Sequence, residues 1–191
     1  CFYANYYSEE IYLEKFANAF PFRKHKVFFS DYFRTQFPLE VDQKVAKVYY
    51  YIQMKTGFLS EFLFGGELFY KNFYNNLLSL SESRYGTSLK EAFKGIPAII
   101  CGAGPSLDKN FETLRTLSDR ALIFGGGTAM NALNAKGINP HFGGGIDPNW
   151  IQYTRLIANN AYMTPYFYRG RMNNNALKIV HGDKIYVPGT S

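Results

Sequence analysis

The stretch Pro97-Ala98-Ile99-Ile100-Cys101-Gly102-Ala103-Gly104-Pro105-Ser106 decides the predicted fold. Its first five residues form a short apolar run bounded by turn residues, which is typical of a buried parallel strand. Glycines at 102 and 104 let the backbone approach a ligand closely, and a helix behind them would offer free N–H groups to a phosphate. Ser106 could cap that helix or donate to a phosphate oxygen. An ordinary strand-to-helix turn needs similar residues, so a purely structural role stays open.

Strand and helix patterns alternate after this run. The apolar and glycine pattern predicts further strands at 121–124, 141–146, 163–168, 178–180 and 184–187, with helices at 108–117, 128–136 and from 147 to about 160. This alternation predicts an α/β fold with a Rossmann-like, doubly wound, mostly parallel sheet. Ligands bind beyond the carboxyl ends of such strands, which selects the loops at 102–106, 125–128 and 147–149.

The first 94 residues have a different composition, because 23 of the 34 Phe and Tyr residues lie in positions 1–74. Helical spacing of apolar residues predicts helices before Pro21, over about 40–56 and over 68–80, with a short strand at 27–29. We therefore expect an aromatic-rich, mainly helical region over 1–94 and a Rossmann-like nucleotide-binding domain over 95–191, truncated at its C-terminus.

A net charge of +6 suits an anionic ligand, but the basic residues are dispersed. The one basic cluster, Arg23 to Lys26, is more typical of a solvated turn than of a binding patch, so no motif supports nucleic acid binding. Cys1 and Cys101 give neither a disulfide framework nor a metal-binding pattern, and no segment is apolar enough to span a membrane. A cytoplasmic location is expected.

Two common nucleotide fingerprints do not fit the first loop. The dinucleotide fingerprint requires a third glycine, where this chain has Leu107, and an acid about 20 residues later, where it has Phe124-Gly125-Gly126-Gly127. A nicotinamide cofactor is therefore not expected. No Gly-Lys-Ser/Thr follows the loop either, which excludes a Walker loop.

The next two loops carry polar side chains at the same predicted sheet edge. Thr128 is a good helix N-cap, and Asn131 lies one turn later on the same face, so both could reach a base or a sugar. Asp147 followed by Pro148 is a preferred helix start, with Asp as N-cap and Pro at the first helical position. Alternatively, Asp147 binds a ribose hydroxyl or a divalent cation beside the phosphates.

Three motifs together resemble one family. Ala98–Leu107, Gly127-Thr128-Ala129 and Gly137-Ile138-Asn139-Pro140 with Ile146-Asp147-Pro148 are similar in order and spacing to the MptE-like domain. Bacterial motility accessory factor (Maf) proteins and archaeal 6-hydroxymethylpterin diphosphokinases share this domain. The resemblance covers roughly residues 95–191, and residues 1–94 are more weakly similar to the N-terminal region of the bacterial members. Gly143-Gly144-Gly145 departs from the family pattern, where bulkier strand residues are expected.

The resemblance implies a fold similar to that of bacterial sialyltransferases, in which a Gly-x-Gly-Pro-Ser loop lies near the nucleotide. It also implies that Thr190-Ser191 begins the Thr-Ser-Gly segment of that site, and the chain's Cys1 start and turn-like end fit a fragment of a longer protein. The resulting nucleotide and phosphate site comprises Gly102, Ala103, Gly104, Pro105, Ser106, Gly127, Thr128, Asn131, Asp147, Pro148, Thr190 and Ser191.

Three functions remain open at this point. The preferred one is a glycosyltransferase of the Maf type that uses a CMP-linked nonulosonic acid or similar nucleotide sugar to modify a protein such as flagellin. The second is an ATP-dependent diphosphokinase acting on a pterin alcohol, in which Mg²⁺ bridges phosphates and Asp147 becomes a metal ligand. The third is a non-catalytic nucleotide-binding module, since no residue stands out as a general base. No permanently bound cofactor is expected.

Overall fold

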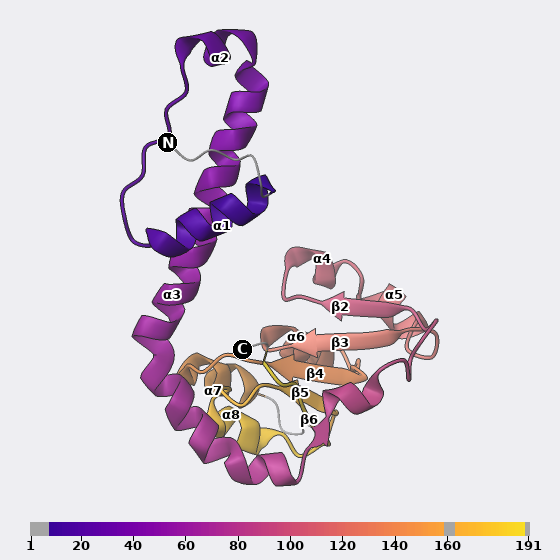
Figure 1. The fold of residues 1–191 in the computed structure, drawn as a ribbon. Coiled ribbons are helices and arrows are strands. Elements are labelled where there is room, and N and C mark those ends of the chain that lie inside the picture. Colours follow the sequence, from indigo (N-terminus) through magenta and orange to yellow (C-terminus); the bar gives the residue numbers. More distant parts are fainter. Residues whose placement is uncertain (1–7, 159–162, 190–191) are drawn as a thin grey trace. The chain divides into compact units, whose positions relative to one another are not determined.

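The computed structural model describes residues 8–158 and 163–189, and the chain divides into two compact units, Cys1–Gly66 and Glu67–Ser191 (Figure 1). The helices are α1 (Glu9–Ala19), α2 (Asp31–Gln36), α3 (Pro38–Ser81), α4 (Pro105–Asp108), α5 (Phe111–Thr116), α6 (Thr128–Ala135), α7 (Trp150–Leu156) and α8 (Asn174–Ile179), with a 3₁₀ turn η1 at Gly86–Leu89. The strands are β1 (Arg84–Tyr85), β2 (Ala98–Cys101), β3 (Leu122–Gly126), β4 (Phe142–Gly145), β5 (Tyr166–Tyr168) and β6 (Lys184–Tyr186).

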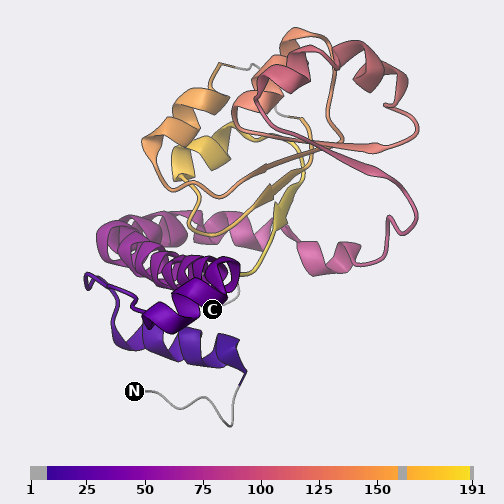
Figure 2. The same ribbon diagram turned by 90° about the horizontal axis from the view of Figure 1, so that it is seen from above.

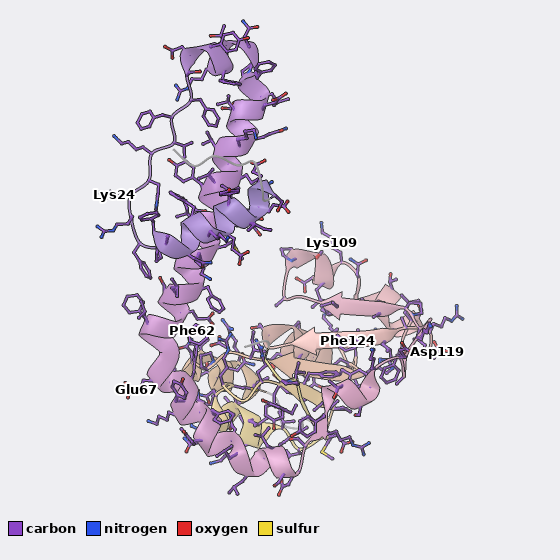
Figure 3. The ribbon with its side chains drawn as sticks, viewed as in Figure 1. Lys24, Phe62, Glu67, Lys109, Asp119 and Phe124 are labelled. Carbon is purple, nitrogen blue, oxygen red and sulfur yellow. The ribbon has the colours of Figure 1, made fainter. Side chains whose placement is uncertain are left out.

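The first unit is built from α1, α2 and the first part of α3. Ion pairs join α1 to α3, with Lys44 Nζ 3.5 Å from Glu9 Oε2 and Lys47 Nζ 3.6 Å from Glu10 Oε1. Many aromatic side chains of this unit are exposed, Phe28 at 79% among them, and Figure 3 shows how densely side chains cover it. The helical character predicted for this region is confirmed.

Two details of the predicted N-terminal half are wrong. The strand expected at 27–29 is irregular chain that lines an apolar cleft of about 790 Å³. The two helices expected at 40–56 and 68–80 form one continuous helix of 44 residues, α3, which begins with Pro38 at its first position. Gly57, Gly65 and Gly66 do not interrupt it, because a glycine in a helix costs only about 0.5–1 kcal/mol relative to alanine.

The second unit contains a six-stranded parallel sheet in the order β1-β6-β5-β4-β3-β2, which confirms the predicted α/β fold. From β2 to β6 each strand lies beside the one before it. Right-handed crossovers in one direction place all their helices on the same face of the sheet. Figure 2 shows the helices of residues 105–179 gathered on one side of the strands.

The packed face holds two apolar clusters. Ile123 of β3 packs with Leu107 of α4, Phe111 and Leu114 of α5 and Leu133 of α6. The second cluster joins the strand β5 to the helices α6, α7 and α8 and consists of Met130, Leu156, Tyr166, Tyr168, Met172, Ala176, Leu177 and Val180. Because strand side chains alternate between faces, the neighbours of these strand residues must point to the opposite face.

That opposite face carries an aromatic row. Phe124, Phe142 and Phe167 of three adjacent strands contact one another at ring centroid distances of 5.1–6.1 Å, and Phe93 covers Phe142 at 5.6 Å. Towards the carboxyl ends of the strands the face is open: Ile100 is 85% exposed, and the opening beside it has a volume of about 420 Å³.

Several predicted boundaries in this half need correction. The helix expected over 108–117 is divided into α4 and α5 at Lys109-Asn110. The strand expected at 178–180 is instead the end of α8, because Asn173 caps a helix there: its side chain accepts a hydrogen bond from the Ala176 N–H at 3.1 Å. Strand β4 runs through Gly143-Gly144-Gly145, the position at which the sequence departs from the family pattern.

Candidate functional site

The three predicted loops follow the carboxyl ends of three adjacent strands, β2, β3 and β4. Cys101 pairs with Gly125 and Gly126 pairs with Gly144 in the parallel register, so the chain leaves all three strands at one edge of the sheet. This is the edge at which ligands bind in α/β sheets.

In the first loop, neither crowding nor a positive φ requires the glycines at 102 and 104. Gly104 has an extended backbone, with φ −114° and ψ 167°, and is the N-cap of α4 with Pro105 behind it. A Cβ added at Gly102 would meet nothing within 4 Å, and one at Gly104 would meet only the Ser106 Oγ at 3.9 Å. Ser106 lies inside the first turn of α4 and is not its cap. The fold therefore leaves the space above Gly102 and Gly104 open to a ligand.

The helix α4 itself is only four residues long, so it is a weak source of positive potential. One of its carbonyl oxygens, that of Ser106, accepts a hydrogen bond from Asn110 Nδ2 of the following turn at 2.6 Å. Any anion held at this loop would rely on backbone N–H groups and on cations from neighbouring elements.

In the second loop, the chain changes direction at Gly127. This residue has a φ of +48° and is the N-cap of α6, so Thr128 is the first helical residue and does not cap the helix as we expected. The Thr128 side chain is exposed. Asn131 donates from Nδ2 to the Arg155 carbonyl oxygen at 2.5 Å, so its amide ties α6 to α7. The structure brings Thr128 to the sheet edge but engages Asn131 elsewhere.

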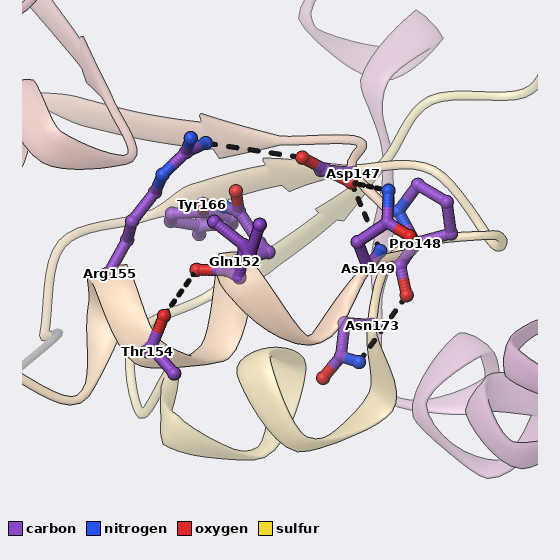
Figure 4. A network of polar contacts seen from close by, with 9 residues as sticks. Asp147, Pro148, Asn149, Gln152, Thr154, Arg155, Tyr166 and Asn173 are labelled. Atoms are coloured by element: carbon purple, nitrogen blue, oxygen red, sulfur yellow. Dashed lines mark hydrogen bonds and ion pairs between the residues drawn. The ribbon is translucent and has the colours of Figure 1, made fainter.

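The third loop is held by Asp147. Its Oδ1 accepts from the Asn149 N–H at 3.0 Å and from Asn149 Nδ2 at 2.9 Å (Figure 4). Asn149 is the N-cap of α7, which begins at Trp150, so Asp147 and Pro148 are not the helix cap and first turn that we expected. An Asx turn over 147–149 competes with the helix and delays its start.

Arg155 is the site residue that sequence reasoning missed. Its Nη1 lies 4.0 Å from Asp147 Oδ2, and its Cδ lies 3.9 Å from the Cβ position that a side chain at Gly127 would have. Figure 4 shows the Arg155 side chain reaching from α7 back to Asp147. Long helical side chains point towards the N-terminus of their own helix, which explains the reach. No motif marks Arg155, and only its position on the helix behind Asp147 could have suggested it.

This grouping can bind an anion. The Arg155 side chain is 46% exposed and its guanidinium has five N–H donors in a planar fork that matches phosphate geometry. The pair with Asp147 at 4.0 Å is loose, so the guanidinium keeps capacity for a ligand. Arg155 places its charge beside Gly127, and the open loop at Gly102 follows a strand that ends at the same edge of the sheet, so this edge suits a phosphate.

A magnesium site fits these residues less well. Asp147 would be its carboxylate ligand, but both oxygens of that group already face donors, Asn149 on one side and Arg155 on the other. Among the described residues no group of three or more His, Cys, Asp or Glu side chains could hold a metal ion. Mg²⁺ in phosphate-transfer sites is usually bound by one or two carboxylates together with the substrate phosphates, so Asp147 alone would be its protein ligand here.

Other chemically active side chains have structural roles. Burial raises the pKa of the Cys101 thiol, which disfavours the reactive thiolate. His141 accepts the Ile123 N–H at Nδ1, 3.0 Å away, and so aligns the start of β4. Thr190 and Ser191, which the resemblance placed in the site, lie outside the described residues.

Comparison with known proteins identifies similar chains. Residues 71–191 match the family described as 6-hydroxymethylpterin diphosphokinase MptE-like. An uncharacterized protein of Treponema pallidum (strain Nichols) is 45% identical over 56 residues, which are 29% of this chain and 27% of that protein. A solved Maf glycosyltransferase from Magnetospirillum magneticum AMB-1 is 25% identical with a TM-score of 0.44, and the likeness covers 50% of this chain and 16% of that one. The matched regions therefore span about a quarter or less of those two proteins.

None of the described helices is both long and apolar enough to cross a membrane.

Proposed function

The chain belongs to the family of 6-hydroxymethylpterin diphosphokinase MptE-like proteins, and from this premise we propose that it binds a nucleotide at the ends of β2, β3 and β4. We further propose that it is part of a nucleotide-sugar-dependent glycosyltransferase of the motility accessory factor type. Its donor is a CMP-linked nonulosonic acid or a similar sugar, and its acceptor is a protein such as flagellin.

One observation carries this proposal: Arg155 and the open glycine loops lie at the same sheet edge. The phosphate of a CMP-linked sugar needs hydrogen-bond donors and one or two positive charges, and it needs no metal to bridge phosphates. Arg155 Nη1, 4.0 Å from Asp147, supplies such a charge. The open backbone at Gly102 and Gly104 lets the phosphate approach main-chain N–H groups.

The same residues at this sheet edge support the diphosphokinase function less well. Transfer of a diphosphate from ATP relies on divalent cations that neutralise the phosphates. Asp147 is the acid at this edge that would hold such a cation, and its Oδ1 already accepts two hydrogen bonds from Asn149. A guanidinium beside the phosphate therefore fits a CMP-linked donor better than an ATP–magnesium complex.

The chemistry of the proposed transfer is a displacement at the anomeric carbon. An acceptor hydroxyl oxygen forms the new bond to that carbon while the bond to the phosphate oxygen breaks. CMP leaves with the bonding electrons, and the acceptor proton passes to a base. Arg155 would stabilise the negative charge that grows on the leaving phosphate. We assign the base to no described residue, and the exposed Thr128 hydroxyl would contact the sugar or the nucleoside.

A thermal-shift screen separates the three functions. CMP, UDP and ATP are each added to the protein with and without Mg²⁺, and the unfolding temperature is recorded. Stabilisation by CMP that is independent of Mg²⁺ supports the transferase. Stabilisation by ATP that depends on Mg²⁺ would replace it with the diphosphokinase. A CMP response without sugar transfer to any protein acceptor would favour the non-catalytic module, and no response to any nucleotide would contradict all three.

The cytoplasmic location remains part of this proposal. It is supported by the buried Cys101, a free thiol, as is usual in a reducing compartment.

A further inference from the structure

The last turns of α3 place two asparagine side chains inside the sheet-bearing unit. Asn72 is 4% exposed and Asn76 is completely buried, and they lie one helical turn apart on the same face. A buried amide is costly unless it is hydrogen-bonded, so a helix that only needed to pack would carry apolar residues here.

The two amides bind different loops. Asn72 Nδ2 donates to the Pro148 carbonyl oxygen at 2.9 Å and to the Arg171 carbonyl oxygen at 3.2 Å. Asn76 Nδ2 donates to the carbonyl oxygens of Gly170 and Met172 at 2.9 and 2.8 Å. Both residues hold the chain that follows β5, but of the two only Asn72 donates to the loop that carries Asp147.

The Asp147 loop receives further support from α8. The Asn173 N–H donates to the Asp147 carbonyl oxygen at 3.0 Å, and Asn173 Nδ2 donates to the Pro148 carbonyl oxygen at 3.3 Å, as Figure 4 shows for the second bond. Asn173 is itself buried and caps α8. The Pro148 carbonyl thus accepts two side-chain amides, one from α3 and one from the start of α8.

We propose that Asn72 is a positioning residue for the nucleotide site, because it fixes the backbone on which Asp147 turns towards Arg155. The hydrogen bonds to the carbonyl oxygens of Asp147 and Pro148 fix the backbone of this loop. The Asp147 carboxylate is thereby held where it accepts the Asn149 N–H and faces the Arg155 guanidinium. The inference rests on the proposed function for its ligand, CMP. The contacts themselves lie within the unit Glu67–Ser191 and within the family match, which starts at residue 71.

Asn76 provides a matched control for Asn72. Both side chains are buried asparagines on one face of α3, and each donates two hydrogen bonds to backbone carbonyls. Replacement by leucine keeps the size of either side chain and removes both of these bonds, and at Asn76 it also removes the bond that Oδ1 accepts from Asn174 Nδ2 at 2.8 Å. Asn76→Leu should therefore lower the unfolding temperature at least as much as Asn72→Leu, so a stronger effect of Asn72→Leu on ligand binding is not a loss of stability. A difference in CMP affinity between the two variants therefore measures the effect of the Asn72 bond to the Pro148 carbonyl.

The test measures CMP affinity and amide hydrogen exchange for the wild type and both variants, well below their unfolding temperatures. Asn72→Leu should weaken CMP binding about tenfold, the factor that corresponds to about 1.4 kcal/mol for ordering the released Asp147 loop when the ligand binds, and Asn76→Leu should change it less than about twofold. Equal weakening by both variants, or by neither, would overturn the positioning role.

Hydrogen exchange of the Asn149 amide keeps this test independent of the ligand. That N–H donates to Asp147 Oδ1, so release of the loop should speed its exchange in Asn72→Leu and leave it unchanged in Asn76→Leu. If the wild type fails to bind CMP but the exchange rates differ as stated, the proposed function fails and the positioning of the loop stands. Unchanged exchange of Asn149 in Asn72→Leu would contradict the inference whatever CMP does.

Discussion

Arg155 Nη1 lies 4.0 Å from Asp147 Oδ2, and this pair joins the helix α7 to the loop that follows β4. Both side chains are partly exposed, at 46% for Arg155 and 35% for Asp147. Such pairs contribute little to folding, about 0–1 kcal/mol at most. Their position beside Gly127, at the edge where α/β sheets bind ligands, makes the pair more informative about binding than about stability.

Arg155→Gln should weaken CMP binding strongly and leave the fold intact. Removing one charge-assisted contact to phosphate predicts a loss of about 1.5–3 kcal/mol in binding free energy. The Asn131 bond survives in the variant because it uses the Arg155 main-chain oxygen. Calorimetric titration of CMP measures the effect. Arg120→Gln is the control, since Arg120 is 77% exposed and pairs only loosely with Asp119 at 3.9 Å. Equal affinities in the two variants would remove Arg155 from the site.

Gly102→Ala and Gly104→Val should fold normally and lose the CMP response. A Cβ fits at both positions without close contact, and neither glycine has a positive φ. The unfolding free energy should stay unchanged or rise by about 0.4–1 kcal/mol in Gly102→Ala, because the unfolded chain loses freedom, and it should fall slightly in Gly104→Val, because valine is a poorer helix N-cap than glycine. Thermal unfolding with and without CMP gives both quantities. A variant that keeps the full CMP response would show that the loop does not approach the nucleotide.

Substitution by alanine should destabilise the protein at Gly143 of β4 but not at the neighbouring Gly144. At Gly143 a Cβ would lie 2.5 Å from Tyr166 Cδ2 and 2.8 Å from Met130 Sδ, whereas at Gly144 the nearest atom is 3.6 Å away. Overpacking should make Gly143→Ala less stable by about 1–3 kcal/mol. Gly144→Ala should be close to neutral. Urea unfolding measures both, and similar losses would contradict the assignment of one packed and one open face.

Stability should fall at alkaline pH partly through Tyr168. Burial raises the pKa of its phenol above 10.0, the nearby Tyr186 and Tyr85 raise it further, and a hydrogen bond with Ser83 lowers it. The folded state therefore holds this proton more tightly than the unfolded state. The resulting stability is complete below the ordinary pKa and is lost as pH rises through the folded pKa.

Tyr168→Phe isolates that contribution. Between about pH 9 and pH 11 the unfolding free energy of the wild type should decline more steeply than that of the variant, by no more than about 1.4 kcal/mol per pH unit. Denaturant unfolding across this range gives the two slopes. Parallel slopes would mean that Tyr168 titrates alike in the folded and unfolded chains.

The central strands and their order of appearance were predictable from the sequence because each is a short apolar or glycine-rich run between turn residues. β2, β3, β4 and β6 lie within one or two residues of the predicted ranges. The end of α6 was also predictable: Gly137, with φ +67°, follows the helix, and the N–H groups of Gly137 and Ile138 bond back to Asn134 and Leu133.

Most errors in the predicted helix and strand boundaries arise because polar side chains compete with the backbone for hydrogen bonds. Asp147 takes the Asn149 N–H in an Asx turn, which moves the start of α7 to Trp150, and Asn173 caps a helix where apolar residues suggested a strand. The helix α3 is continuous because a glycine inside a long helix lowers its stability only modestly. Arg155 and Asn72 could not be found from motifs, because their roles depend on loops 8 and 76 residues away in the chain.

Calorimetric titration of CMP into the wild-type protein, in buffer with EDTA and without added metal, tests whether the chain binds this nucleotide through Arg155. We expect saturable one-site binding that is weakened about tenfold or more by Arg155→Gln. Absence of CMP binding, together with ATP binding that appears only when Mg²⁺ is restored, would contradict it.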